Sequence, residues 1–372
     1  MDEGPDAPPE PGRPLRRGWT TGACATAAAK AAYRALLTGA FPDPVEIVLP
    51  KGERPSFALA LEERGEGFAR AGIVKDAGDD PDVTHGALVM SCVRLAAPGS
   101  GVSFRAGEGV GTVTLPGLPL APGEPAINPK PREMMRAAIA EVAAEEGAAG
   151  DVEIEVSIRD GAALAQKTWN PRLGIVGGLS VLGTTGVVVP YSCSAWIHSI
   201  HRGVDVARAA GYPHVGAAVG ATSEAALQRL YGLPETALID MGDFVGGLLK
   251  YLRAHPLPRL TIAGGFAKIS KLAAGRLDLH SGRSQVDAGF LSALAAERGA
   301  SEELVARIAA APTGLAALRL GHEIGLADAV AAQARATAIE ALHGSEVSIE
   351  VLAVDREGAV VGRAADDAFR RA

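Results

Sequence analysis

The chain has 372 residues, of which 48% are hydrophobic and 21% are charged, proportions that are typical of folded globular proteins and exclude a largely disordered chain. Its 36 basic and 43 acidic residues give a net charge of −7, so nucleic-acid binding is not indicated, and no apolar run has the length of a membrane span. Three scattered cysteines without metal-ligand spacing argue against a disulfide scaffold and a structural zinc, and favour the reducing cytoplasm.

The N-terminal part of the sequence divides into a tail and a first helix. Residues 1–14 are rich in proline and acidic side chains, and we interpret them as a disordered tail. The Ala-rich run 27–37 has good helix propensity. Thr20 or Thr21 is its expected N-cap, and Gly39 is its expected C-terminal stop.

Strand-like runs dominate the next part of the chain. Short apolar segments separated by glycine, proline and acidic clusters are typical of strands, and they lie at 45–49, 56–61, 68–74 and 87–95. A helix is predicted over 132–146, and the alternating run 151–158 indicates a strand with one wet face. We therefore predict an α+β domain over 15–165.

Residues 166–372 are predicted to form an α/β domain with a parallel, Rossmann-like sheet. An apolar strand, a glycine turn and a helix recur three times at a spacing of about 23 residues, which indicates βαβ units. The three strands are predicted at 214–219, 237–241 and 259–263, and their helices at 222–230, 244–253 and 266–274. A helix over 192–210 precedes the repeats, while a helical region over 286–342 and a strand over 346–354 follow them.

The repeated glycine turns are candidate ligand-binding points. Open parallel sheets bind ligands at the carboxyl ends of their strands, where backbone N–H groups can hold a phosphate or a carboxylate and Asp243 can bind ribose hydroxyls. Lys268 and Lys271 share a helix face that could hold a ligand carboxylate, with a solvated face as the alternative. The predicted cofactor-binding residues are Gly220, Thr222, Gly242, Asp243, Gly264, Gly265 and Lys268. Neither a complete Gly-x-Gly-x-x-Gly fingerprint nor a P-loop is present.

An acidic segment over 74–86 carries four aspartates within seven positions. Carboxylates this close repel one another, which raises some of their pKa values unless cations or backbone donors intervene. Divalent metal binding is one interpretation, although the EF-hand spacing fails, and a solvated acidic turn is the other. Thr84 and His85 form a candidate acid–base or hydrogen-bonding pair beside the next strand.

The tripeptide Thr-Thr-Gly occurs at 20–22 and again at 184–186. Each copy brings hydroxyls and backbone N–H groups to one place, which suits a ligand, and helix capping or turn formation is the alternative. Cys24 follows the first copy at a helix start, where a thiolate is stabilised. No histidine base is placed beside it, so a cysteine-nucleophile hydrolase is disfavoured.

Several of these segments, in this order and spacing, resemble one family. They read LRRGWTTGACA at 15–25, KDAGDDPDVTHG at 75–86, INP and PREM within 127–134, GGLSVLGTTG at 177–186, GDFVG at 242–246 and KISKLAAG at 268–275, ahead of HS at 280–281. From about Leu15 to Val354 the chain resembles the cobalt-precorrin-5B C(1)-methyltransferases, the CbiD family of anaerobic cobalamin biosynthesis. It departs from that pattern at Gly265 in place of histidine, at Asp243 in place of asparagine, and at 191–196 in place of a more acidic stretch.

The resemblance implies a cytoplasmic enzyme that transfers a methyl group from S-adenosylmethionine to ring carbon 1 of cobalt-precorrin-5B, giving cobalt-precorrin-6A and S-adenosylhomocysteine. Cobalt enters only as part of the tetrapyrrole substrate, and no protein metal site, nucleic-acid partner or membrane partner is expected. Self-association into a homo-oligomer stays open. Two alternatives are an NAD(P)-dependent oxidoreductase, against which the missing fingerprint counts, and a non-catalytic tetrapyrrole carrier.

The sites that go with this interpretation are hypotheses. The tetrapyrrole is expected in a cleft between the domains, with positioning and desolvation supplying most of the acceleration and no dedicated base required. The predicted catalytic residues are Thr21, Asp79, His85 and Thr185. The predicted substrate-binding residues are Thr20, Gly22, Cys24, Asp76, Thr84, Asn128, Arg132, Thr184 and Gly186. The candidates to pair with substrate carboxylates are Arg16, Arg17, Arg132 and Arg202.

Overall fold

The computed structural model describes residues 14–369, which form two compact units, unit 1 up to Ser192 and unit 2 from Cys193. The tail predicted at the N-terminus lies, but for its last residue, outside the described residues. The domain boundary expected from the sequence is at 165/166, whereas residues 166–192 group with unit 1. Two short antiparallel pairings hold them there, β10 (Ile175–Val176) with β8 (Thr112–Val113), and β11 (Val187–Val188) with β1 (Gly18–Trp19).

Unit 1 is built on a five-stranded sheet in the order β4-β5-β6-β9-β7, in which only the β7–β9 pair is parallel. Its strands are β4 (Leu61–Gly65), β5 (Phe68–Val74), β6 (Leu88–Leu95), β7 (Val102–Ala106) and β9 (Val152–Ile158), beside a small hairpin of β2 (Val45–Glu46) and β3 (Ser56–Phe57). Burial alternates along β9 as its sequence predicts. Sequence reasoning missed β7, although its residues, Val-Ser-Phe-Arg-Ala, alternate between apolar and polar.

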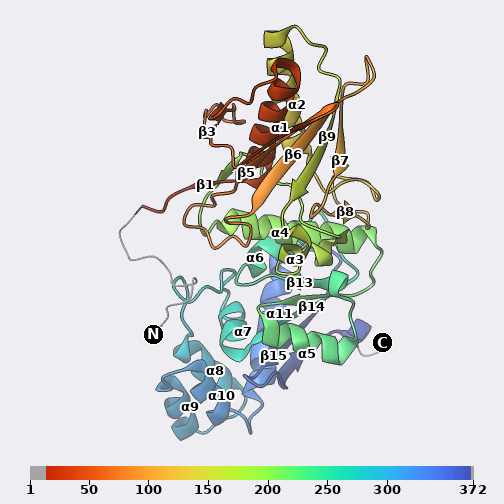
Figure 1. Cartoon of the computed structure of the whole chain (residues 1–372). Helices are drawn as coiled ribbons and strands as arrows, with labels where there is room; N and C mark the ends of the chain where they lie inside the picture. The colour runs from red at the N-terminus through yellow and green to blue at the C-terminus, as the bar shows by residue number, and fades with distance from the viewer. Residues whose placement is uncertain (1–13, 370–372) are drawn as a thin grey trace. The chain divides into compact units, whose positions relative to one another are not determined.

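Helices α1 (Thr21–Thr38) and α2 (Pro129–Glu146) cover one face of this sheet (Figure 1). Alanine is the commonest residue of α1, so this helix can approach the sheet and α2 closely on several sides, and most of its residues are buried. Thr20 is its N-cap, with the side chain accepting a hydrogen bond from the Ala23 N–H, and Gly39 in the left-handed conformation ends it. Both predicted end signals are confirmed. A short helix, α3 (Gly161–Ala165), follows β9.

Unit 2 contains a second five-stranded sheet in the order β13-β12-β14-β15-β16. The first four strands are parallel and β16 is antiparallel to β15, which confirms the predicted parallel sheet in an α/β unit. The strands are β12 (Val215–Ala218), β13 (Leu238–Asp240), β14 (Arg259–Gly265), β15 (Ser348–Val354) and β16 (Val360–Ala364). The helices are α4 (Cys193–Ala209), α5 (Ala221–Tyr231), α6 (Val245–Leu252), α7 (Phe266–Ala273), α8 (Ala288–Glu297), α9 (Glu302–Ala309), α10 (Gly314–Leu320) and α11 (Leu326–Ala341).

The helices of unit 2 lie on both faces of its sheet. Alternate strand residues divide between two hydrophobic clusters, one shared with α4, α6, α7 and α11 and the other with α5 (Figure 1). The connection from β12 to β13 therefore runs over one face, and that from β13 to β14 over the other. Because β13 and β14 flank β12 on opposite sides, the chain reverses direction across the sheet between β12 and β14. Such a point is where open α/β sheets bind ligands.

A buried carboxylate lies on the α5 face of this sheet. Glu350 of β15 is fully buried, and its Oε2 accepts a hydrogen bond of 2.7 Å from the Thr261 hydroxyl. The Arg363 Nε donates to Oε1 at 2.8 Å, and the Tyr231 hydroxyl also donates to the carboxylate. Burial and this carboxylate raise the pKa of Tyr231. The group is thus compensated by one cation and two hydroxyls.

Candidate functional site

The two Thr-Thr-Gly turns of unit 1 lie against each other. The Thr20 N–H donates to the Gly186 carbonyl at 3.0 Å. The Thr21 hydroxyl accepts from the Leu182 N–H at 3.0 Å, and the Gly22 N–H donates to the Leu182 carbonyl at 2.9 Å. The start of α1 and the segment ending at Gly186 therefore form one rigid loop pair.

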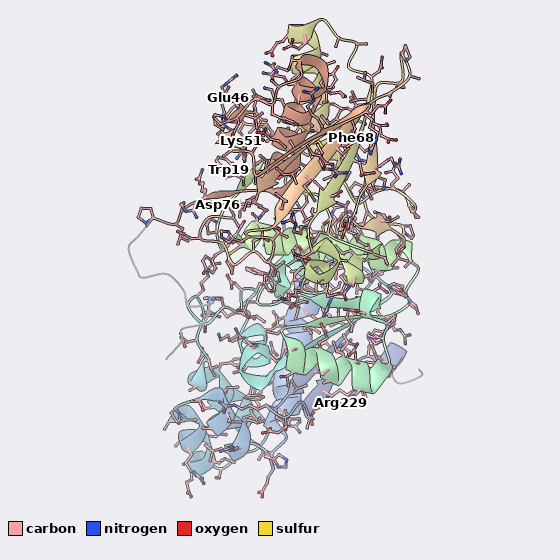
Figure 2. The ribbon with its side chains drawn as sticks, in the orientation of Figure 1. Trp19, Glu46, Lys51, Phe68, Asp76 and Arg229 are labelled. Atoms are coloured by element: carbon pink, nitrogen blue, oxygen red, sulfur yellow. The ribbon has the colours of Figure 1, made fainter. Side chains whose placement is uncertain are left out.

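The acidic segment joins this loop pair. The Trp19 N–H donates to the Asp76 carbonyl at 2.7 Å, and Figure 2 shows the two residues on adjoining segments. The Arg16 N–H donates to the Asp79 carboxylate at 2.7 Å, and its guanidinium forms an ion pair with the Asp76 carboxylate. Further along, the Tyr191 N–H donates to the Asp80 carboxylate at 2.8 Å. Segments far apart in sequence thus meet at one place.

Each aspartate of the acidic segment has its own donors. Hydrogen bonds from the Arg16 guanidinium and the Gly78 N–H lower the pKa of Asp76 to about 2. Burial alone would raise the pKa of Asp82, but the ammonium of Lys75, at 2.7 Å, and the donors of Thr84 lower it. Burial raises the pKa of Asp80. The carboxylates are therefore ordered by protein donors, and among residues 14–369 no group of three or more His, Cys, Asp and Glu side chains is arranged to hold a metal ion.

His85 lies at the exposed edge of this loop cluster. Its side chain is 54% exposed, and its Nδ1 accepts a hydrogen bond of 3.1 Å from the Ala77 N–H. An acceptor at Nδ1 places the proton of the neutral ring on Nε2. The Thr84 hydroxyl donates to Asp82 instead of pairing with His85, so the expected hydroxyl–imidazole pair is not formed.

A cavity of about 400 Å³ opens beside His85. Its wall includes the apolar side chains of Val74 and Val83, both well exposed, together with Arg159 and Asp160. Sequence reasoning missed Arg159, because it lies at the end of a strand with no motif around it. The cavity offers an imidazole and a guanidinium beside aliphatic walls.

Three predicted substrate-binding residues have structural partners instead of a free surface. Cys24 is fully buried in the core of unit 1, and burial raises the pKa of its thiol to about 12. The expectation of a stabilised thiolate at this helix start is therefore wrong. Gly22 is buried, and a Cβ there would lie 2.7 Å from Pro131. The Arg132 guanidinium donates to the carbonyls of Ile127 and Pro125 at 2.7 and 3.1 Å, so backbone occupies the donors expected to face a substrate carboxylate.

The remaining residues of unit 1 lie on its surface or in its turns. The Asn128 N–H donates to the Val181 carbonyl at 3.0 Å, which brings the start of α2 to the same loop cluster. Thr184 is exposed, and the Thr185 hydroxyl binds the backbone of Val187. Arg17 is also exposed. In unit 2, Arg202 pairs with Asp205 in the same helix at 3.1 Å, so its charge is already partly used.

In unit 2 the predicted glycines lie at three carboxyl strand ends, as expected. Gly220 lies just after β12 and Gly265 is the last residue of β14, so the two lie on either side of the reversal point. A Cβ at either position would meet nothing within 4 Å. Gly264 is different, because a Cβ there would lie 2.8 Å from Val219. Gly242 has a positive φ of 50° and lies under the Trp196 ring. Only the first two glycines lack a packing reason.

Polar residues surround these strand ends. The Lys268 ammonium lies 2.6 Å from the Asp243 carboxylate, so these two predicted residues are brought together. Thr222 is exposed on the first turn of α5 and faces Gly358 instead. Trp196, which sequence reasoning did not single out, is 40% exposed, and its indole N–H donates to the Asp240 carbonyl at 3.3 Å.

Comparison with known proteins identifies the family. The CbiD family model matches residues 9–190, and the model for the CbiD C-terminal domain matches residues 278–365. A protein of Paramagnetospirillum magneticum named cobalt-precorrin-5B C(1)-methyltransferase is 63% identical over 350 residues, covering 94% of this chain and 98% of that protein. The chain belongs to the CbiD family.

A second curated CbiD relative agrees with this assignment. A Brucella anthropi protein with the same name is 62% identical over 351 residues, 94% of this chain and 95% of that protein. A crystal structure of the cobalamin biosynthesis protein CbiD from Archaeoglobus fulgidus has 28% identity and a TM-score of 0.40, covering 72% of this chain and 83% of that one. No helix within residues 14–369 of this CbiD chain has the length and apolarity that a bilayer crossing requires.

Proposed function

We propose that this chain methylates carbon 1 of cobalt-precorrin-5B in cobalamin biosynthesis, with S-adenosylmethionine as the donor. The observation that carries the proposal is the 63% identity, over nearly the full length of both chains, with a protein named for this reaction. When bound, the donor supplies a methyl group that its positive sulfur already activates. The chain's own residues then need to position two ligands and exclude water.

We place the donor on the parallel sheet of unit 2, in the manner of Rossmann-like sheets. Gly220 and Gly265 support this placement, because they flank the reversal point between β12 and β14 and neither the backbone angles nor neighbouring atoms require glycine there. An absent side chain at such a point lets a ligand approach the backbone. The open space at Gly220 and Gly265 is therefore compatible with a bound donor.

We place the tetrapyrrole on the loop cluster of unit 1, where the Thr-Thr-Gly turns meet the acidic segment. The support is chemical: His85 and Arg159 are exposed beside aliphatic walls of a cavity, and a tetrapyrrole presents an apolar ring edged with carboxylates. Arginine pairs well with such carboxylates. Asp79 and Thr21, proposed as catalytic, hold the cluster through backbone contacts, so we expect them to act by positioning.

The reaction is tested by incubating the protein with cobalt-precorrin-5B and methyl-labelled S-adenosylmethionine and locating the label by NMR. We expect label on carbon 1 alone. Label at another ring position would disprove the stated reaction, and binding of both ligands without transfer would favour the carrier.

The donor placement is tested by calorimetric titration of Gly265→Asp protein with S-adenosylhomocysteine. The position has room for the side chain, so the variant should fold, while the added bulk and charge should abolish binding. Gly289→Asp on α8, at an exposed glycine of the same unit, is the control. Equal affinity in the two variants would refute this placement.

A further inference from the structure

Two lysines of α7 converge on one carbonyl oxygen. The ammonium groups of Lys268 and Lys271 each lie 3.0 Å from the carbonyl oxygen of Leu279. Lys271 is only 4% exposed, whereas the Lys268 side chain is 29% exposed. Placing two ammonium groups at one oxygen, one of them inside the protein, is unfavourable unless another negative group joins them.

The hydrogen bonds of the two ammonium groups are incompletely used. An ammonium has three N–H donors. Lys268 uses one on Asp243 and one on Leu279, whereas Lys271 donates only to Leu279. In the part of the chain that the structure describes, the buried Lys271 ammonium thus has two N–H groups without a protein acceptor. Burial, followed by the charge of Lys268, lowers the pKa of Lys271.

The charges around the pair leave a surplus. Asp243 is the one carboxylate among residues 14–369 that lies within ion-pair distance of either lysine, and only its Oδ1 is engaged. The neighbouring Asp278 is paired with Arg283 at 2.7 Å. The cluster therefore offers free N–H donors and one net positive charge beside a carboxylate oxygen that is free to accept.

This cluster lies at the strand ends where the donor is placed. Asp243 directly follows Gly242 after β13, and Lys268 lies three residues beyond Gly265 at the end of β14. A ligand with a carboxylate and an ammonium on the same carbon atom would match both the free donors and the free acceptor. An α-amino acid has this arrangement.

We propose that Lys268 and Lys271 bind the α-carboxylate, and the free oxygen of Asp243 the α-ammonium, of the amino-acid end of the methyl donor. The inference rests on the proposed function, since it presumes a donor in unit 2. This proposal makes Lys271 a donor-binding residue even though its side chain is almost fully buried.

The test compares two ligands by calorimetry. S-adenosylhomocysteine carries the amino-acid end, whereas 5′-methylthioadenosine lacks it. In Lys271→Met protein we expect affinity for S-adenosylhomocysteine to fall about 10- to 100-fold, the effect of losing a charge-assisted contact. Affinity for methylthioadenosine should stay unchanged, which also reports that the variant is folded.

The controls separate this inference from the proposed function. Lys250→Met removes an exposed lysine of α6 and should change neither affinity. If Lys271→Met does not fold, Lys268→Met, at a half-buried position, should show the same selective loss.

An equal loss for both ligands, or no loss, would overturn the lysine assignment alone. Unchanged donor binding with weakened binding of cobalt-precorrin-5B would overturn it too, by assigning the pair to a substrate carboxylate. Failure of wild-type protein to bind either adenosyl ligand would instead count against S-adenosylmethionine as the donor, and so against the proposed function.

Discussion

The Asp76 carboxylate ties the acidic segment to Arg16, which lies just before β1, and this contact depends on pH. Its folded-state pKa, at about 2, lies below the ordinary value of about 3.9 for aspartate. A depressed carboxyl pKa stabilises the fold above the ordinary value, and the contribution is lost as pH falls towards the folded value. The relevant window is therefore between about pH 4 and pH 2.

We predict that Asp76→Asn flattens the acid limb of stability. Between pH 4 and pH 2 the free energy of unfolding of the wild type should fall more steeply than that of the variant, because the variant has no carboxylate to protonate at position 76. Urea titrations at several pH values measure both. Parallel curves would show that the Arg16–Asp76 contact contributes nothing to the fold.

A second residue-scale prediction concerns Glu350. Arg363→Met leaves this fully buried carboxylate without its cation, which should destabilise the protein by about 3 kcal/mol. Adding Glu350→Gln should recover part of the loss, since a neutral amide needs no counter-charge. Urea denaturation of the three proteins checks this. A double variant less stable than Arg363→Met would contradict the charge argument.

At the same scale, sequence reasoning found many of the right residues but not their partners. Thr20 was predictable as a helix cap, because capping is local. The burial of Cys24 was not, since it depends on chain that lies far away in sequence. The backbone partners of Arg132 lie only five and seven residues before it, but no sequence pattern directs its side chain to them. Asp243 and Lys268 were chosen separately, and only the fold shows that they touch.

At the scale of elements, the contact between the two Thr-Thr-Gly turns depends on Gly183. It has a φ of 131°, and a Cβ there would lie 2.2 Å from the Thr20 hydroxyl oxygen. Gly177 also has a positive φ, of 87°, but a Cβ there would meet nothing within 4 Å. An alanine at Gly177 would therefore introduce backbone strain alone, whereas an alanine at Gly183 would also clash with Thr20.

We predict that Gly177→Ala costs about 1 to 2 kcal/mol of stability, the usual strain of a left-handed residue. Gly183→Ala should cost roughly 1 to 3 kcal/mol more, because Thr20 must move away. Chemical denaturation of both variants gives the difference. Equal losses would show that the turns can separate without cost.

The elements themselves were largely predictable. The three strand–turn–helix repeats of unit 2 follow from local patterns, and their observed bounds differ from the predicted ones by at most two residues. Strand β16 was missed because long-range pairing, more than a local pattern, makes it a strand. Strand β7 alternates between apolar and polar residues and was predictable from its sequence. The order of the strands in either sheet has no local signal at all.

At the scale of the whole molecule, each unit has its own hydrophobic core. We propose that the two units unfold as separate cooperative transitions. Ala28→Leu, which overpacks the fully buried face of α1, should lower the midpoint of the unit 1 transition and leave that of unit 2 unchanged.

The domain limits could not be placed from sequence, because the last segment of unit 1 resembles the glycine-rich stretches that follow it.

The measurement uses the distribution of the three tryptophans. Trp19 and Trp169 lie in unit 1, and Trp196 lies in unit 2. Fluorescence melts of a variant that keeps only Trp196 and of one that lacks it report the two units separately. A common shift of both melts on Ala28→Leu would mean that the chain unfolds as one body.

The pairing of β1 with β11 also constrains how the protein is made. The partners of Thr20 and Thr21, at Gly186 and Leu182, are synthesised more than 160 residues later. During translation α1, most of whose residues are buried in the folded protein, leaves the ribosome long before β11 and the turns at 182–186 that pack against its start. The first unit can therefore close only after nearly all of it has emerged, and the nascent chain must keep its most buried helix from other partners until then.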